Sequence, residues 1–385
     1  TRDQRTIHVH IGIYYDISSN CSKVYDGRRQ AMDKITKRDF IKTTLAGAFT
    51  AFGLTIIGCS KKGRKLSEKL YVYNWANYIS NKTIPDFEKE FNVKVIYDNF
   101  SNNEELLAKL QTGAGGYDVI FPSDYMVGIM RKQNLLEELD MKNIPNFKNI
   151  GSRFKDLPFD PGNVYSIPYF WGTTGIGYNS EKITENIDSW KILWDERYKG
   201  KISMLDDMRG LANPPLKLLG YSINTTDPKQ IKEAENMLLK QKPLVKAYTS
   251  DTYIDFLVSG DILLAQAYSG DVFQAMKENK KIKYAIPKEG SDIWIDNMCI
   301  PRGAKNKYTA EVFINYILRP EVSAEISNFT WYANPNDASR KFIKPEIINN
   351  KSIYPPDEVL NLCEYQKDVG PATKYYEQLY NKVKS

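Results

Sequence analysis

Histidine is almost absent from this sequence, and cysteine is scarce. The 385 residues contain two histidines, His8 and His10, and four cysteines. If the first 58 residues are removed from the working protein, no histidine remains, which excludes Ser-His-Asp and Cys-His catalysis and histidine-ligated metal sites. Beyond Cys59 only Cys299 and Cys363 follow, too few for a disulfide framework. We expect these two to be half-buried free thiols.

A basic excess is also missing from most of the chain. The whole sequence holds 53 Lys and Arg against 47 Asp and Glu, a net charge of +6. Residues 1–58 carry nine of the basic and five of the acidic residues, which leaves 44 against 42, or +2, in residues 59–385. Such a balance gives no electrostatic footprint for nucleic acid, so we expect no nucleic-acid partner.

One uncharged stretch has the length of a signal peptide rather than of a membrane helix. Thr43 to Gly58 is uncharged over 16 residues and follows Lys37, Arg38 and Lys42, whereas a membrane helix needs about 20 apolar residues. We predict a signal peptide over residues 32–58. Residues 1–31 are then expected to be an upstream extension or artefact without function.

The end of this stretch, IIGC at residues 56–59, resembles the lipobox of bacterial lipoproteins. The resemblance implies cleavage before Cys59, lipidation of its thiol, and a lipid anchor as the only contact with the membrane. Residues 59–69 would be a solvated tether. The alternative is a buried helix that ends in a free cysteine. The run KRDFIK also resembles a twin-arginine signal, so the export route stays open.

Beyond the leader, apolar residues follow strand and helix periods in turn, which is typical of βαβ units around parallel sheets. Ser101 and Glu104 resemble a capping box for a helix that contains Leu106 and Leu110. The pattern predicts two α/β lobes. The predicted strands cover residues 70–73, 93–97, 117–121, 166–179, 201–207 and 293–300, with two more within 261–270 and 281–290. The predicted helices cover residues 84–91, 309–318 and 320–328, a segment from residue 272 and a segment at 376–383.

Aromatic and acidic residues gather where the predicted strands end. In parallel α/β sheets, ligands bind just beyond the carboxyl ends of the strands. No Lys or Arg belongs to this group. Its members are Trp75, Tyr78, Ser123, Asp124, Tyr125, Asp206, Asp207, Tyr268, Trp294, Asp296 and Tyr332.

These residue types favour a ligand that is cationic at intervals and apolar between. Aromatic faces attract cations by about 0.5–2 kcal/mol, and carboxylates accept charge-assisted hydrogen bonds of roughly 1.5–3 kcal/mol from ammonium groups. Aromatic walls also bury methylenes at about 0.8 kcal/mol each. A linear polyamine has both features.

The chain from about Leu70 to Lys384 resembles the spermidine/putrescine-binding proteins of bacterial ABC importers. The motifs that carry the resemblance are YNWANY, YDVIFPSDY, YSIPYFWGTTGIGYN, KISMLDDMR, GYSINTTDPK, WIDNMCIP, INYILRP and CEYQKDVG. It implies a two-lobed periplasmic-binding-protein type 2 fold of the α/β class, in which each lobe is a mainly parallel sheet flanked by helices and the ligand lies in the cleft between lobes. Lobe 1 would comprise residues 70–171 plus 296–340, and lobe 2 residues 172–295 plus 341–385.

The resemblance also assigns site residues, with no catalytic residue, metal ligand or cofactor among them. Asp207 would hold one amine, Asp296 would hold a central or terminal nitrogen, and Trp294 would stack on the ligand. Two departures concern the choice of polyamine: Asn77 and Gly210 stand where some relatives have carboxylates. The expected ligand-binding set is Trp75, Tyr78, Ser123, Tyr125, Asp207, Tyr268, Trp294, Asp296, Tyr332 and Gln366.

Other interpretations of these residues remain open. Trp75 and Tyr78 could be ordinary lobe packing, and Ser123 or Asp207 could cap a helix. Adjacent residues on a strand face opposite sides, so Asp206 and Asp207 cannot form a catalytic pair.

The predicted function is capture of putrescine or spermidine outside the cytoplasm and delivery to an ABC permease, by a monomer. Alternatives keep the fold but bind another cation such as ferric iron, or make the protein a polyamine sensor. An enzyme is disfavoured.

Overall fold

The computed structural model describes residues 64–113 and 116–385. The predicted leader, the lipidation residue Cys59 and the first part of the tether lie outside these residues. In the described part, no helix has both the length and the apolar character to cross a membrane.

A ten-stranded mixed sheet is the frame of the described part. Strand β1 is parallel to β2 and β3, and β5 is parallel to β6 and β7. The path through eight strands runs β2 (Lys94–Phe100), β1 (Lys69–Trp75), β3 (Val119–Ile120), β9 (Asp292–Cys299), β4 (Ser166–Asn179), β7 (Leu264–Tyr268), β5 (Ile202–Met204), β6 (Val245–Tyr248), while β8 (Ile282–Ala285) pairs with β4 and β10 (Glu364–Tyr365) with β9.

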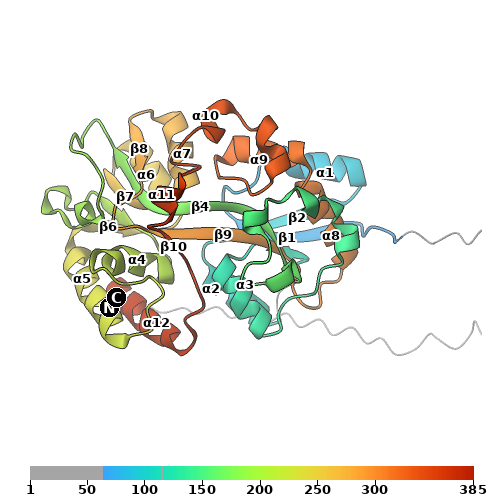
Figure 1. Ribbon diagram of the computed structural model, residues 1–385, viewed down its shortest axis with the longest axis horizontal. Helices are drawn as coiled ribbons and strands as arrows, with labels where there is room; N and C mark the ends of the chain where they lie inside the picture. Colours follow the sequence, from blue (N-terminus) through green and yellow to red (C-terminus); the bar gives the residue numbers. More distant parts are fainter. Residues whose placement is uncertain (1–63, 114–115) are drawn as a thin grey trace, which may run out of the picture. The chain divides into compact units, whose positions relative to one another are not determined.

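Strands β4 and β9 join the two parallel groups. They pair antiparallel with each other, β9 also pairs with β3, and β4 also pairs with β7. Figure 1 shows them as two long ribbons that run from one group to the other. Nearly every residue of both strands is buried, which explains why residues 166–179 show no regular alternation of apolar and polar residues.

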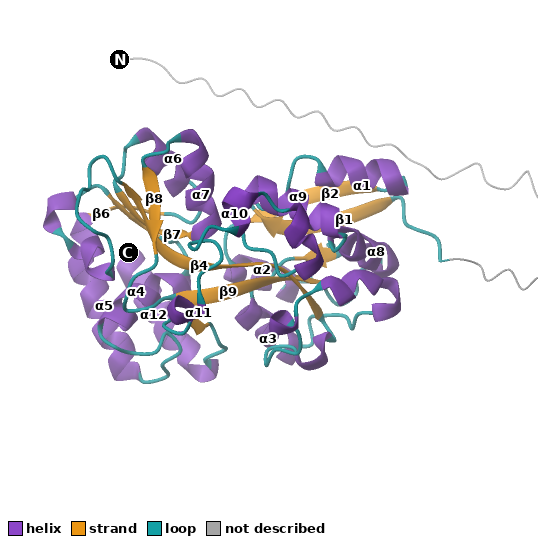
Figure 2. Cartoon of the chain, turned by 45° about the horizontal axis from the view of Figure 1, so that its top comes forward, coloured by secondary structure: helices purple, strands orange, loops and turns teal. Residues whose placement is uncertain are grey.

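Helices cover both parallel groups. Figure 2 shows α4, α5 and α12 together beside the β5–β7 group, and α1 and α8 beside β1 and β2. The helices are α1 (Thr83–Phe91), α2 (Asn103–Gln111), α3 (Asp124–Lys132), α4 (Met208–Leu218), α5 (Pro228–Gln241), α6 (Tyr253–Ser259), α7 (Ser269–Glu278), α8 (Lys307–Ile317), α9 (Pro320–Thr330), α10 (Pro345–Ile348), α11 (Asp357–Leu360) and α12 (Thr373–Lys384).

Most predicted elements are confirmed within a few residues, but two local predictions are wrong. The strand expected over 117–121 pairs only at Val119–Ile120. The capping box is shifted by one residue: Asn102 is the N-cap and accepts from the Glu105 amide at 2.8 Å, and the Glu105 carboxylate accepts from the Ser101 amide at 3.0 Å. An Asn at N-cap binds the N3 amide as well as Ser does.

The two cysteines of the described part are free thiols, as expected. Cys363 is half-buried, but Cys299 is fully buried at the end of β9.

Candidate ligand-binding site

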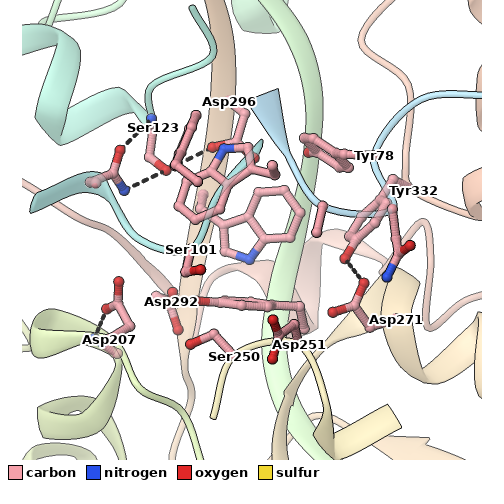
Figure 3. Close-up of a pocket in the computed structure, with 18 of the residues that line it drawn as sticks. Tyr78, Ser101, Ser123, Asp207, Ser250, Asp251, Asp271, Asp292, Asp296 and Tyr332 are labelled. Carbon is pink, nitrogen blue, oxygen red and sulfur yellow. Dashed lines mark hydrogen bonds between the residues drawn. The ribbon is translucent and has the colours of Figure 1, made fainter. Parts of the chain in front are cut away.

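A pocket of about 870 Å³, a volume that includes space open to solvent, is lined by residues from both parallel groups. Figure 3 shows acidic and aromatic side chains facing one another across it. All ten residues predicted from the sequence line this pocket, namely Trp75, Tyr78, Ser123, Tyr125, Asp207, Tyr268, Trp294, Asp296, Tyr332 and Gln366.

The ends of parallel strands bring these residues together. Trp75 is the last residue of β1, and Tyr268 is the last residue of β7. Asp207 directly precedes α4, shortly after β5 ends. Strand β9 contributes Trp294 and Asp296 from its interior. The edge at which parallel strands end is the usual ligand-binding edge of such sheets.

The aromatic rings are held in place by packing and by hydrogen bonds. The indole nitrogen of Trp75 donates to the Phe121 carbonyl at 2.8 Å, and its ring lies 4.5 Å from that of Phe100. The ring of Trp294 meets that of Tyr332 at 5.5 Å, in an edge contact. Fixed rings offer their faces to a ligand without losing rotamer freedom on binding.

Two glycines make room for these rings. A Cβ at Gly172 would lie 2.5 Å from the Trp294 ring, and a Cβ at Gly270 would lie 2.5 Å from the Tyr332 ring. Because such distances are far below van der Waals contact, any side chain there would displace a ring of the pocket wall.

A chain of hydrogen bonds orients Asp296. The Asn103 amide donates to the Ser123 hydroxyl at 3.1 Å, and the Ser123 hydroxyl donates to Asp296 Oδ1 at 2.7 Å (Figure 3). Ser123 occupies the N-cap position of α3, but its side chain makes no capping bond. The capping alternative for Ser123 is therefore wrong.

Asp207 does cap α4, because its Oδ1 accepts the Gly210 amide. A second oxygen remains for another donor. The neighbouring Asp206 lies outside the pocket lining, where it accepts from the hydroxyl of Tyr380 and from Lys384 at 2.5 Å. Of the two aspartates, only Asp207 lines the pocket.

Four further carboxylates line the pocket and were not in the predicted set: Asp124, Asp251, Asp271 and Asp292. A signal for Asp292 was present, because it alternates with Trp294 and Asp296 on one face of a strand. Asp124 lies between two predicted residues. Asp271 is held by the hydroxyl of Tyr253 at 2.7 Å and by that of Tyr332, contacts that no local pattern reveals.

The pocket is acidic without a basic counterpart. No Lys, Arg or His is among its lining residues, and none of the ion pairs in the described ranges involves Asp124, Asp207, Asp271, Asp292 or Asp296. The Arg209 guanidinium lies nearby, 5.8 Å from the Tyr125 ring centre, but donates to the carbonyls of Lys367 and Ile223.

Burial raises the pKa of these carboxyl groups. It raises the pKa of Asp296 to about 7, although the bond from Ser123 acts in the opposite direction, and the pKa of Asp271 to about 6. Burial likewise raises the pKa of Asp207 and Asp292. A buried carboxylate without a cation is poorly stabilised, so the pocket favours a cationic guest.

No group of three or more His, Cys, Asp or Glu side chains within residues 64–113 and 116–385 has the geometry to hold a metal ion.

A profile of the family described as bacterial extracellular solute-binding protein matches residues 82–355. The chain belongs to this family. It is 40% identical over 337 residues to the spermidine/putrescine-binding periplasmic protein of Escherichia coli, an alignment that covers 87% of the chain and 97% of that protein.

Two solved structures are similar to this solute-binding protein. A spermidine/putrescine ABC transporter protein of Listeria monocytogenes is 38% identical, with a TM-score of 0.80 over 83% of this chain and 99% of that one. A lipoprotein of Treponema pallidum is 32% identical, with a TM-score of 0.73 over 82% and 99% of the two chains. The two-lobed α/β fold predicted from the sequence is thereby confirmed, while the bounds of the two lobes remain predictions.

Proposed function

We propose that this solute-binding protein captures a polyamine, putrescine or spermidine, outside the cytoplasm and delivers it to an ABC permease. The observation that carries the proposal is the pocket itself: aromatic walls and six carboxylates line it, without a basic residue. The curated relative from Escherichia coli, named as a spermidine/putrescine-binding protein, supports the same ligand class.

In this proposal the rings of Trp75 and Trp294 contact the methylene chain, and Asp296 and Asp207 accept hydrogen bonds from ammonium groups. The ligand bridges residues that come from both parallel groups of strands. It therefore stabilises the arrangement in which the two groups close on it, and the permease recognises that closed arrangement. The protein binds and releases its ligand without chemical change.

Calorimetric titration of the full chain with putrescine, spermidine, spermine and cadaverine tests the proposal. At least one should bind with a micromolar or lower Kd, and Asp296→Asn should weaken that binding roughly 100-fold, because it removes a charge-assisted bond in a desolvated site. Asp206→Asn, which changes the same charge outside the pocket, is the matched control. Absence of binding by every polyamine would refute the proposal, and metal analysis would then test ferric iron.

We also propose that the mature protein is a monomer anchored through a lipid on Cys59. The sequence motif before Cys59 and the likeness to the Treponema lipoprotein support the anchor. Cys59→Ser should move the protein from the membrane fraction to the soluble fraction of expressing bacteria. An unchanged membrane fraction would contradict the anchor.

A further inference from the structure

Asp292, the first residue of β9, is a buried carboxylate whose hydrogen bonds are incomplete. Its Oδ2 accepts from the Thr174 hydroxyl at 3.0 Å and from the Gln366 amide at 3.3 Å. The Ser291 hydroxyl lies 3.3 Å from Oδ1, but it also lies 2.6 Å from the Thr174 carbonyl. A hydroxyl has a single hydrogen to donate, and the shorter contact takes it. Among the described residues, Ser291 is then the one hydrogen-bond partner of Asp292 Oδ1, and the Asn213 amide, which also lies near this carboxylate, has no hydrogen-bond partner of its own.

Two more acceptors at this end of the pocket are also incomplete. The side-chain oxygen of Gln366 is buried and has no hydrogen-bond partner in the described part of the chain. Asp207 uses Oδ1 for the Gly210 amide, and Oδ2 has no hydrogen bond of ordinary length to a described residue, although the Arg209 backbone amide also lies near this carboxylate. Figure 3 shows Asp207 and Asp292 next to each other at the same side of the pocket. Burial raises the pKa of Asp207, and the charge of Asp292 raises it further.

Asp207, Asp292 and Gln366 line the same pocket, and each has an acceptor oxygen with spare capacity, which matches the three donors of a primary ammonium group. The cation also removes the repulsion between the two carboxylates, which the neutral donors Thr174 and Gln366 do not. The positive charge of Arg209 offsets part of the negative charge of Asp207. The Arg209 guanidinium makes no hydrogen bond to Asp207, because it donates to the backbone carbonyls of Lys367 and Ile223. Asp271 differs from Asp292, because each of its carboxylate oxygens already accepts a hydrogen bond from a tyrosine hydroxyl, one from Tyr253 and the other from Tyr332.

The glycine at position 210 supports Asp292 as the source of the second negative charge at this end of the pocket. This glycine lines the pocket beside Asp207, and a Cβ there would lie 2.9 Å from Asp207 Oδ1. Helix α4 therefore contributes no carboxylate at this position. The second negative charge at this end comes from β9 instead.

We propose that Asp292, Asp207 and Gln366 form a three-acceptor site for a primary ammonium end of the ligand, with Asp292 as a specificity-determining residue. This proposal rests on the proposed polyamine function. The site selects an unsubstituted ammonium, because each alkyl group on the nitrogen removes one donor and leaves one buried acceptor unpaired.

The test is calorimetric titration of the full chain and of Asp292→Asn with 1,4-diaminobutane and with its N,N′-dimethyl form. The parent should bind the diamine at least tenfold more tightly than the dimethyl form. Asp292→Asn should weaken diamine binding roughly 10- to 100-fold and reduce the preference for the unsubstituted form. Asp206→Asn is the control for charge, and Asp292→Ser is the second variant if the amide variant does not fold.

The melting temperature of the ligand-free proteins separates a ligand-binding role from a structural one. Removal of an unpaired buried charge should leave the Tm of Asp292→Asn equal to or above that of the parent. Diamine affinity within twofold of the parent, or a loss of affinity accompanied by a lower Tm, would overturn the assignment. If the parent protein binds no polyamine, that result refutes the proposed function as well as the role of Asp292. If the parent binds a polyamine but Asp292→Asn has no effect, only the role of Asp292 is refuted.

Discussion

At the scale of single residues, Asp296 links ligand binding to pH. Its side chain is buried, accepts one hydrogen bond from Ser123, and has no basic partner among the pocket residues. Burial raises its pKa to about 7, so in the ligand-free protein the carboxyl is half protonated near neutral pH. An ammonium guest needs the ionised form.

We therefore expect polyamine affinity to rise between pH 5 and pH 7 and to level off above pH 7. The ligand stays cationic throughout, since alkyl ammonium groups titrate near pH 10. The rise should approach tenfold per pH unit for each carboxyl that must ionise, and Asp271, with its pKa raised to about 6, adds to it at the acidic end. Titration calorimetry across this range measures the effect, and a flat profile would contradict it.

Ligand-free stability should depend on pH in the opposite sense. The folded pKa of Asp296 is about 7 and its ordinary value is near 3.8, so the folded state holds this proton more tightly. The resulting stabilisation is complete below about pH 4 and is lost as pH rises through 7. Asp296→Asn lacks it, so the Tm of the variant minus that of the parent should increase between pH 4 and pH 7. A constant difference would show that the group does not titrate there.

At the scale of elements, helix α4 depends on the same aspartate that faces the ligand. Asp207 caps the helix through Gly210 and lines the pocket. Two substitutions separate these roles. Asn caps about as well as Asp, whereas Ala does not and costs about 1 kcal/mol.

Asp207→Asn should leave the free energy of unfolding within about 1 kcal/mol of the parent, since only the interaction with the helix dipole is reduced. It should still weaken polyamine binding by roughly tenfold or more, because the charge is gone. Asp207→Ala should lower both quantities. Urea unfolding and calorimetry measure them, and equal binding by the parent and the Asn variant would assign Asp207 to capping alone.

Strand β9 shows how an element pattern specifies a site. Asp292, Trp294 and Asp296 alternate on one face of a strand in which every residue is buried. Alternation normally separates a wet face from a core face. Here it separates a pocket face from a core face, which is why polar residues occur in a fully buried strand.

At the scale of the whole described part, β4 and β9 connect the two parallel groups, and the proposed function requires the groups to close on the ligand. A ligand that contacts residues from both groups should favour closure. We expect the radius of gyration of the protein, measured by small-angle X-ray scattering, to fall when putrescine or spermidine is added at 100 times its Kd. The Asp296→Asn variant at the same ligand concentration should show a smaller change. No change in the parent would argue against closure as the transport signal.

Sequence alone predicted the α/β class, most strands and helices, and the ten residues that the fold brings to one pocket. Nine of the ten belong to the aromatic and polar residues near predicted strand ends, which carry this information because parallel strands end at a common edge. Gln366 was predicted from the family resemblance alone. The predictions that depended on single neighbouring residues, namely the N-cap of α2 and the length of β3, were wrong. The N-cap is Asn102 and not Ser101, and β3 comprises only Val119 and Ile120 of the strand predicted over residues 117–121.

What the sequence by itself determined is which side chains are available: no histidine follows residue 58, no lysine or arginine is among the strand-end residues, and nearly all of those residues are aromatic or acidic, which favours a cationic guest. What only the tertiary structure decided is which acids remain open to that guest. Both oxygens of Asp271 accept from tyrosine hydroxyls of distant segments, whereas among the described residues Asp292 Oδ1 has only the 3.3 Å contact with the Ser291 hydroxyl. Hydrogen bonds between residues far apart in sequence distinguish these two aspartates, and neither residue carries that difference in its own neighbourhood along the chain.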